Sequence, residues 1–421
     1  MGTLMRTLQL NARSERTLLE GRRRSDPEAL RAAERIVGDV RRRGDQALVE
    51  WTERLDRVRV SAKTLKVSAA EMRAAEREAQ PEILRAIEQA ARNIRRVARE
   101  QMPERWSIEP ESGVRVGQIV RPIERIGCYV PGGGAALVST LLMTAVPAQM
   151  AGVAEIVVSC PRPSVNVLAA ASLLGLREVY RAGGAQAIAA LAYGTRTIRP
   201  VEKIFGPGNR YVTAAKQIVS ADCAIDLPAG PTEAVVYAED GNAQWIAADL
   251  LAQAEHAADA VSILVTTSAK LGRAVAEELR EQCARLPEGN PAGRSLAKTG
   301  AIVIAASRGA AMGFINRFAP EHLSLVGRAK EALAEVRSAG TVFLGDYSAQ
   351  PFGDYASGSN HVLPTAGWAR SRAGLSVRDF VKCISVQEIT RAGARRLGPA
   401  AMALARAEGL TAHEQAVKVR L

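Results

Sequence analysis

The chain has 421 residues, of which 47% are hydrophobic and 24% charged, as expected for a folded globular protein of about two or three domains. Only 4% are aromatic, which favours helices packed on sheets over aromatic-rich β architectures. The net charge of +12 would suit a nucleic-acid-binding protein, but the arginine runs are mixed with acidic residues and lack interleaved aromatics, so we interpret them as solvated surface.

The N-terminal part of the chain, to about residue 105, has the pattern of helices. Asp26 followed by Pro27 is a typical helix start, and Ser68 with Glu71 predicts a capping box. From Pro81 onward, apolar residues recur every three or four positions, which places them on one face of a helix. This stripe predicts a helix that packs against the rest of the protein.

Beyond about residue 120 the pattern changes to short β-branched runs that alternate with helical stretches. Two successive series of such runs predict two parallel-sheet α/β units, which an old duplication would explain. The first series has runs at 126–130, 155–160, 178–180 and 203–205, and the second at 234–238, 262–267, 301–306 and 341–344. From Val377 the chain is expected to return to helix and to end in a polar tail.

The sequence has no apolar run of the roughly 20 residues that a membrane helix requires, and its N-terminus lacks the pattern of a secretion signal. Its five cysteines are scattered and form no CxxC pair, as in proteins whose thiols stay reduced. We therefore expect a cytoplasmic protein with no membrane partner and no nucleic-acid partner.

Three glycine-rich turns follow expected strands, at 130–134, 183–186 and 206–209. Ligands of open α/β sheets bind at the carboxyl ends of strands, where glycine lets a phosphate approach the free N–H groups of the next helix. None of the three turns matches GxGxxG, so tight turns without a ligand explain the glycines equally well.

Several histidines stand in polar surroundings. Gln253 and His256 lie three residues apart on an expected helix, so their side chains would share one face and either bind a metal ion or simply face solvent. Asp354 and His361 belong to a Gly-, Ser- and Asn-rich loop of the kind that often carries function. A histidine as close to the C-terminus as His413 usually faces solvent unless the tail docks on a site.

Glu321 and His322 are adjacent and follow Pro320. A carboxylic acid and an imidazole are the two side chains best suited to moving protons near neutral pH. Oxidation of an alcohol needs such a base, because the hydroxyl proton must leave as hydride departs.

Read together, these segments resemble the histidinol dehydrogenase family over nearly the whole chain. The matching segments are VRRRGDQALVEWTERLD (40–56), CYVPGG, GGAQAIAALAYGT, GPGN, AGPTE, QAEH, APEHL, GDYASGSNHVLPT, DFVK and EGLTAHEQAV. The resemblance implies an oxidoreductase of histidine biosynthesis that uses zinc and NAD. In two hydride transfers to NAD it would oxidise L-histidinol, through bound histidinal, to L-histidine.

The resemblance also implies a role for each matched residue. Glu321 and His322 would be the catalytic pair, and Tyr129, Gln186 and Asn209 would contact NAD. The expected zinc ligands are Gln253, His256, Asp354 and His413. The expected substrate-binding residues are Thr232, Gln253, His256, His322, Asp354, His361, Glu408 and His413.

The fold that follows from the resemblance is α/β, with two Rossmann-like parallel-sheet units, a helical N-terminal part and a C-terminal helical tail exchanged in a homodimer. His413 would then complete the metal site of the partner subunit. We expect an N-terminal helical arm over 1–25, a first α/β domain with the metal and catalytic residues over 26–128 and 233–375, a second, NAD-binding domain over 129–232, and the exchanged tail over 376–421.

The chain departs from the family pattern at several positions near these motifs. Thr232 stands where the family usually has serine, which keeps the hydroxyl and adds a methyl group. The other departures are Gly134, Ala136, Ser359, Ala366 and Trp368. They leave open a second interpretation, a related zinc- and NAD-dependent dehydrogenase that acts on another polar alcohol, such as a sulfonated diol.

Overall fold

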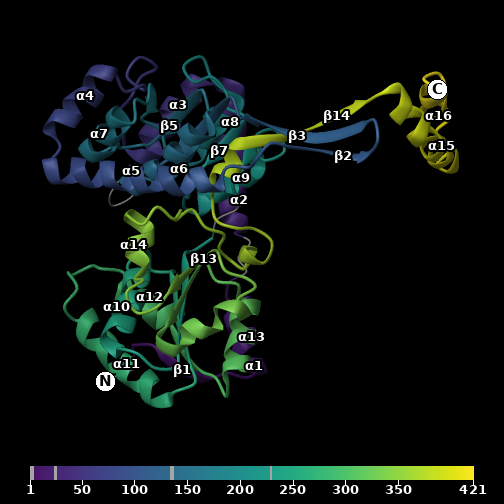
Figure 1. Cartoon of the computed structure of the whole chain (residues 1–421). Helices are drawn as coiled ribbons and strands as arrows, with labels where there is room; N and C mark the ends of the chain where they lie inside the picture. Colours follow the sequence, from purple (N-terminus) through teal and green to yellow (C-terminus); the bar gives the residue numbers. More distant parts are fainter. Residues whose placement is uncertain (1–3, 23–25, 133–136, 228–229) are drawn as a thin grey trace.

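The computed structural model describes residues 4–22, 26–132, 137–227 and 230–421. The chain forms two α/β units, one above the other in Figure 1, and a long arm that leaves the upper unit and carries the C-terminal helices. No helix in the described ranges is long and apolar enough to cross a membrane.

The first unit is built on a five-stranded sheet in the order β6-β5-β4-β7-β8, in which every neighbouring pair is parallel. The expected strands of the first series are all present, and a two-residue edge strand, β8, was not predicted. The strands are β4 (Arg125–Tyr129), β5 (Glu155–Ser159), β6 (Glu178–Tyr180), β7 (Lys203–Phe205) and β8 (Ala224–Ile225), and the helices between them are α6 (Val138–Ala151), α7 (Val165–Leu173), α8 (Gly184–Tyr193) and α9 (Arg210–Val219).

The N-terminal helices pack on this first unit. They are α2 (Pro27–Arg43), α3 (Asp45–Trp51), the π-helix η1 (Thr52–Asp56), α4 (Ala69–Glu78) and α5 (Pro81–Gln101). Both predicted helix starts are confirmed, since Asp26 accepts a hydrogen bond from the backbone N–H of Ala29 and Ser68 forms a reciprocal capping box with Glu71. The apolar faces of the helices meet α6, α7, α8 and α9.

This packing corrects the expected domain boundaries. Residues 26–128 belong with the first sheet rather than with 233–375, and the boundary at 128/129 would cut through its central strand β4. The short helix η4 (Val377–Phe380) also belongs here, because the ring of Phe380 stacks on that of Phe205 at 4.1 Å.

The second unit has a six-stranded sheet in the order β1-β11-β10-β9-β12-β13, and its strand pairs are also parallel. Apart from β1, which is added at the edge, the strands follow the same order as in the first sheet. The strands are β1 (Arg6–Gln9), β9 (Glu233–Ala238), β10 (Val261–Thr266), β11 (Ala301–Ile304), β12 (His322–Val326) and β13 (Thr341–Leu344). The helices are α1 (Ala12–Glu20), α10 (Ala243–Ala254), α11 (Ala269–Cys283), α12 (Ala292–Thr299), α13 (Arg308–Phe318), η2 (Gly327–Glu335), α14 (Gln350–Tyr355) and η3 (Trp368–Arg370).

Two expectations for this unit need correction. The segment 1–25 is not a purely helical arm, because β1 pairs with β11 and makes the start of the chain an edge of the second sheet. The strand β12 was also missed, because Ser324 and His322 interrupt the apolar run that marks the other buried strands.

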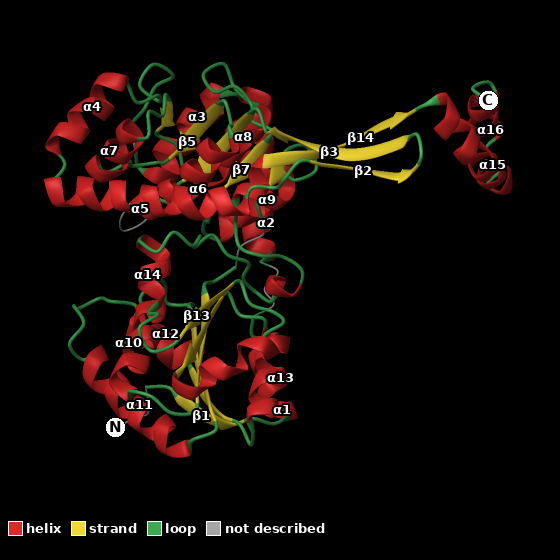
Figure 2. Ribbon diagram, in the orientation of Figure 1, coloured by secondary structure: helices red, strands yellow, loops and turns green. Residues whose placement is uncertain are grey.

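The arm is an antiparallel sheet of three strands that projects away from both units (Figure 2). It consists of β2 (Trp106–Glu111), β3 (Val114–Pro122) and β14 (Val381–Ile389), and it leads to α15 (Arg391–Ala407) and α16 (Thr411–Lys418). The helix expected directly from Val377 is therefore wrong for 381–389. Exposed apolar residues, among them Ile108, Ile384 and Val386, lie along this arm.

Candidate active site

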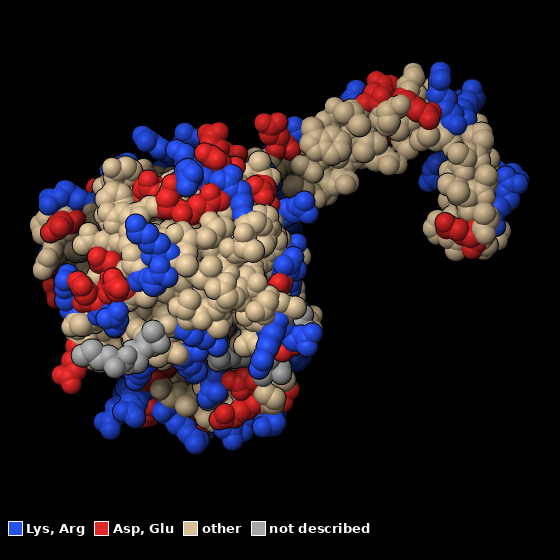
Figure 3. All heavy atoms as spheres, turned by 90° about the horizontal axis from the view of Figure 1, so that it is seen from below, with Lys and Arg blue, Asp and Glu red and all other residues tan. Residues whose placement is uncertain are grey.

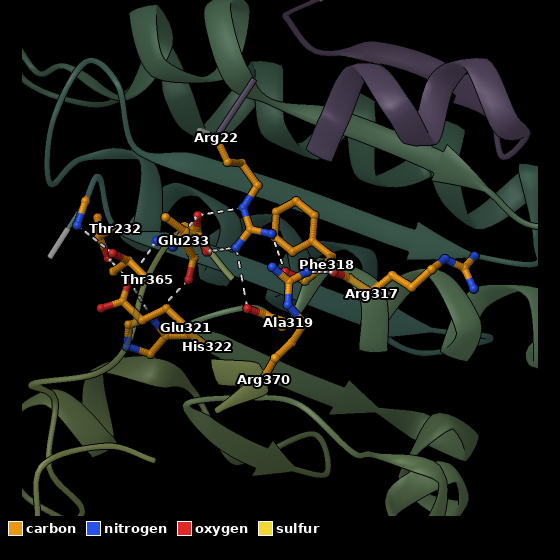
Figure 4. A network of polar contacts seen from close by, with 12 residues as sticks. Arg22, Thr232, Glu233, Arg317, Phe318, Ala319, Glu321, His322, Thr365 and Arg370 are labelled. Atoms are coloured by element: carbon orange, nitrogen blue, oxygen red, sulfur yellow. Dashed lines mark hydrogen bonds and ion pairs between the residues drawn. The ribbon is translucent and has the colours of Figure 1, made fainter. Parts of the chain in front are cut away.

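The expected catalytic pair lies at the amino ends of two neighbouring strands in the second unit. Strand β12 begins at His322 and pairs with β9, so that His322 is opposite Ala234. Glu321 and His322 therefore lie beside Thr232 and Glu233, the residues at the start of β9 (Figure 4).

Glu321 is buried and held by two hydrogen bonds. Its Oε2 accepts from the hydroxyl of Thr232 at 2.6 Å and from the backbone N–H of Glu233 at 2.8 Å. Burial raises the pKa of the Glu321 carboxyl to about 7, because a charged carboxylate is costly in a desolvated position. A carboxyl group with this pKa can take up and release a proton at neutral pH.

One ring nitrogen of His322 forms a hydrogen bond, and the other has no hydrogen-bond partner among the described residues. Its Nδ1 lies 3.1 Å from the backbone carbonyl oxygen of Glu233, which can only accept, so Nδ1 carries the proton. Its Nε2 is buried and finds no hydrogen-bond partner among the described residues, with Asp354 Oδ1 3.7 Å away. Burial acts against a charged ring, but Glu321 and Asp354 outweigh it and raise the pKa of His322. When the ring is neutral, Nε2 carries a basic lone pair.

Gln253 is tied to the same cluster through Thr232. The buried Gln253 lies at the end of α10, and its Nε2 donates to Thr232 Oγ1 at 2.7 Å. With the NH2 group fixed in this way, the carbonyl oxygen of the amide is the atom left to bind a cation. His256 is not on α10, as the sequence suggested, but in the turn after it, where it is exposed.

Three histidine rings interact electrostatically with the carboxyl group of Asp354. Burial acts against its ionisation, yet the rings of His322, His361 and His256 together lower the pKa of the Asp354 carboxyl. His361 donates from Nδ1 to the backbone carbonyl of Asp354 at 3.0 Å, and its Nε2 lies 3.5 Å from the hydroxyl of Thr140 on α6. Because α6 belongs to the first unit, the site spans the boundary between the two units.

Two expected site residues lie elsewhere in the same chain. Glu408 follows the last residue of α15 and His413 lies in α16, both exposed at the far end of the arm (Figure 1). Within the described residues, no group of three or more His, Cys, Asp or Glu side chains is arranged to hold a metal ion. A single chain thus brings together Thr232, Gln253, Glu321, His322, Asp354 and His361, with His256 close to Asp354.

Two of the three residues expected to contact NAD lie around the start of α8: Tyr129 is the last residue of β4, and Gln186 is in the first turn of α8. Tyr129 accepts a hydrogen bond on its hydroxyl from Gly184 N–H at 3.1 Å, and Gln186 donates from Nε2 to Asp56 at 3.0 Å. Asp56 also accepts from Gly183 N–H at 3.0 Å. Burial raises the pKa of the Asp56 carboxyl to about 6.

The N–H groups of the glycine-rich turns are largely used within the protein. Asp56 and Tyr129 occupy those at the start of α8, Gly206 N–H donates to Asp226 at 2.8 Å, and the side chain of Asn209 caps α9. At these two turns the N–H groups of Gly183, Gly184 and Gly206 are therefore not free. In the third turn, positions 133–136, among them Gly134 and Ala136, lie outside the described residues.

Comparison with known proteins identifies the family. Residues 20–421 match the sequence model of the family described as histidinol dehydrogenase. The chain belongs to this family.

Several histidinol dehydrogenases cover almost the whole chain. The protein from Methanothermobacter thermautotrophicus is 44% identical over 99% of both chains, and that from Bradyrhizobium diazoefficiens is 48% identical over 93% of this chain and 92% of its own. The crystal structure of histidinol dehydrogenase from Elizabethkingia anophelis superposes with a TM-score of 0.95 at 38% identity, covering 100% of this chain and 98% of that one. The α/β fold is thus the histidinol dehydrogenase fold, and the chain is an oxidoreductase.

Sequence reasoning missed four residues at this histidinol dehydrogenase site. Glu233 stands in the AGPTE segment, next to the expected Thr232, and Asp56 ends the ERLD segment; both lie in motifs that were recognised without a role being given to these positions. Arg22 belongs to an arginine run interpreted as surface, yet it is buried. Thr140 had no signal beyond its place after a glycine-rich turn.

Proposed function

We propose that this chain oxidises L-histidinol to L-histidine, with NAD as the oxidant and zinc as the ion that holds the substrate. The observation that carries the proposal is the pair at the start of β12. Glu321 is anchored and has a pKa of about 7, and His322 presents a buried, unpartnered Nε2 beside it.

The two residues divide the proton transfers between them. His322 Nε2 takes the hydroxyl proton of the alcohol in the first oxidation, since its Nδ1–H is held by Glu233 O. Glu321 takes a proton from the water that adds to the resulting aldehyde, which converts it to a hydrate for the second oxidation. When bound, NAD supplies the hydride acceptor for each oxidation and zinc supplies an electrophilic anchor for the substrate nitrogens.

A single chain offers three side chains that could bind a zinc ion. Gln253 offers an amide oxygen, His256 an imidazole and Asp354 a carboxylate, and the last two are close enough to affect each other electrostatically. Zinc in proteins prefers four ligands that include imidazole nitrogen. We propose that His413 of a second subunit is the fourth ligand and that Glu408 joins the substrate site in the same way.

The shape of the arm supports this exchange. It leaves the body and carries apolar side chains that are exposed in the described part of a single chain; Leu404 is 65% and Val419 66% exposed. Exposed apolar surface on a projecting element is typical of a subunit interface. The dimer is part of the proposal, as is a cytoplasmic location.

For NAD, Gln186 provides the strongest fit. Its Nε2 is fixed on the Asp56 carboxylate, and its Oε1 is buried without a hydrogen-bond partner among the described residues. This oxygen can accept a hydrogen bond from a hydroxyl or amino group of the dinucleotide. Tyr129 and Asn209 are proposed as the neighbouring contacts.

The decisive experiment measures NADH formed per molecule of L-histidinol consumed. We expect two NADH per substrate, loss of activity after zinc is removed with a chelator, and recovery when zinc is added back. No NADH from L-histidinol, with NADH formed from another polar alcohol such as a sulfonated diol, would overturn the assignment of the substrate.

Subunit exchange has its own test by complementation. The variants His413→Ala and Glu321→Gln are expected to be inactive alone. In mixed dimers one site would receive an intact body and an intact tail, so that co-expression restores about a quarter of wild-type activity. Absence of recovery, with mixed dimers present, would show that the tail does not complete the partner's site.

A further inference from the structure

Glu233 contacts both members of the catalytic pair through its backbone. Its N–H donates to Glu321 Oε2 at 2.8 Å, and its carbonyl oxygen accepts from His322 Nδ1 at 3.1 Å. The placement of this one residue at the start of β9 therefore sets the position of the Glu321 carboxylate and the tilt of the His322 ring. Any shift of Glu233 would move both groups together.

The side chain of Glu233 is held in turn by Arg22. Arg22 Nε donates to Glu233 Oε1 at 2.7 Å and Nη2 to Oε2 at 2.5 Å, so the guanidinium and the carboxylate meet as a two-pronged pair (Figure 4). The side chains are only 6% and 2% exposed. Such a planar pairing fixes orientation as well as distance. Ala366 N–H adds a further hydrogen bond to Oε1 at 3.1 Å.

Arg22 also binds the end of α13, which lies just before the catalytic pair in the sequence. Its Nη1 donates to Phe318 O and its Nη2 lies 3.4 Å from Ala319 O, at the end of α13, while its guanidinium lies 3.6 Å over the ring of Phe318. Ala319 has a left-handed backbone, with φ of 51°. This is an uncommon conformation for a residue with a side chain, and only Pro320 separates it from Glu321.

We propose that Arg22 is a positioning residue for the reaction, which fixes Glu321 and His322 by holding the start of β9 and the end of α13 at once. This inference rests on the proposed function of the catalytic pair. It makes the segment after α1 part of the active site, although Arg22 is separated from Glu233 by more than 200 residues and its hydrogen bonds among the described residues go to Glu233, Phe318 and Ala319 rather than to the catalytic pair.

A purely structural role is the alternative, and a pair of variants separates the two. In Arg22→Met the carboxylate of Glu233 is left buried without its cation, so both stability and geometry suffer. In the double variant Arg22→Met/Glu233→Gln the stranded charge is gone and stability should return. If Arg22 positions the catalytic pair, kcat stays low in the double variant; if it only stabilises the fold, kcat returns together with the melting temperature.

The matched control is Arg317→Met. Arg317 also links α13 to the N-terminal segment, since its Nη2 donates to Glu15 of α1 at 3.0 Å, but its side chain is 57% exposed and its carboxylate partner is Glu15 rather than Glu233 (Figure 4). We expect kcat of the zinc-loaded enzyme to fall about 10- to 100-fold in Arg22→Met and in the double variant. The KM for L-histidinol should stay within about two-fold, and Arg317→Met should keep its kcat.

A measurement made without substrate tests the positioning role of Arg22 independently of the proposed function. The Nδ1–H proton of His322, observed by NMR in protein with 15N-labelled histidine, should change its chemical shift in Arg22→Met and in the double variant but not in Arg317→Met. An unchanged signal, or a double variant with restored kcat, would overturn the positioning role. If the wild type forms no NADH from L-histidinol while the signal still moves, the proposed substrate fails and the positioning role stands.

Discussion

The two sheets of this protein share a strand order but use their polar groups differently. In the first sheet, the N–H groups of Gly183, Gly184 and Gly206, which follow β6 and β7, are satisfied by Asp56, Tyr129 and Asp226. In the second sheet, the catalytic pair lies at the amino ends of β9 and β12, and His322 keeps an unpartnered nitrogen. A shared topology therefore does not determine at which end of a sheet the chemistry takes place.

Charges of both signs are mixed on one face of the molecule. On the face seen in Figure 3, lysine and arginine side chains alternate with aspartate and glutamate over the body. Of the arginines interpreted as solvated surface, Arg41, Arg42 and Arg43 are exposed, whereas Arg22 is buried.

The largest effect is expected from His322→Asn. Asparagine can still donate to Glu233 O, but it has no basic nitrogen in place of Nε2, so kcat should fall about 100- to 10,000-fold with the melting temperature nearly unchanged. The control is Lys203→Met, at the corresponding first position of β7 in the other sheet. If Lys203→Met lowered kcat as much as His322→Asn, the catalytic residues would not be confined to the amino ends of the strands in the second sheet.

The next effect concerns the stability of the first unit. Lys216 is buried, pairs with Asp226 and donates to Gly206 O at 2.9 Å. Lys216→Met leaves Asp226 without its cation and should lower the free energy of unfolding by about 3–5 kcal/mol, while kcat well below the melting temperature is retained. Denaturant unfolding measures the loss, and adding Asp226→Asn should restore part of it. A fall in kcat with unchanged stability would contradict the structural use of these groups.

A smaller effect is expected at the edge of the first sheet as the pH falls. Hydrogen bonds from Arg125 lower the pKa of Glu178 to about 2, below its ordinary value of 4.5. The ionised pair therefore stabilises the fold above pH 4.5, and this contribution is lost as the pH falls from 4.5 towards 2. The difference in unfolding free energy between wild type and Glu178→Gln should be constant at neutral pH and shrink in this range. A difference that does not depend on pH would exclude this ion pair as its source.

The smallest effect belongs to a departure from the family pattern in the second unit. Ala366, one of the departures noted from the sequence, has a left-handed backbone with φ of 52°. Ala366→Gly removes this strain but adds freedom to the unfolded chain, so the net gain should be below about 1 kcal/mol. Urea unfolding can detect it, with Ala369→Gly in η3 as a variant that should destabilise. A clear loss of stability in Ala366→Gly would show that the left-handed backbone is not strained.

Much of the fold was predictable because buried parallel strands have continuous β-branched sequences. The runs that became β5, β10 and β11 are of this kind. The arm strand β14 was missed because most of its residues face solvent, which leaves no apolar run. The assignment of the N-terminal helices failed for another reason, since an apolar stripe shows that a helix packs but not on which sheet.

Site residues that belong to a recognisable sequence motif could be predicted. Residues that reach the site only through the folding of distant segments could not. The motif containing Glu321 and His322 could be recognised, and the structure brings both to Thr232 and Gln253. Their place at the amino end of a strand contradicts the usual rule for α/β sheets, which had been applied to the glycine-rich turns. The burial of Arg22 depends on a partner far away in sequence, so no local pattern could reveal it.

The path of the chain through the second unit affects how this unit folds during synthesis on the ribosome. Leu8 of β1 pairs with Val303 of β11, so β1 waits during synthesis for a partner that is made nearly three hundred residues later. At about ten residues per second this delay is on the order of half a minute, during which the intervening first unit can already fold. The sheet of the catalytic unit therefore cannot be completed until long after β1 has been made.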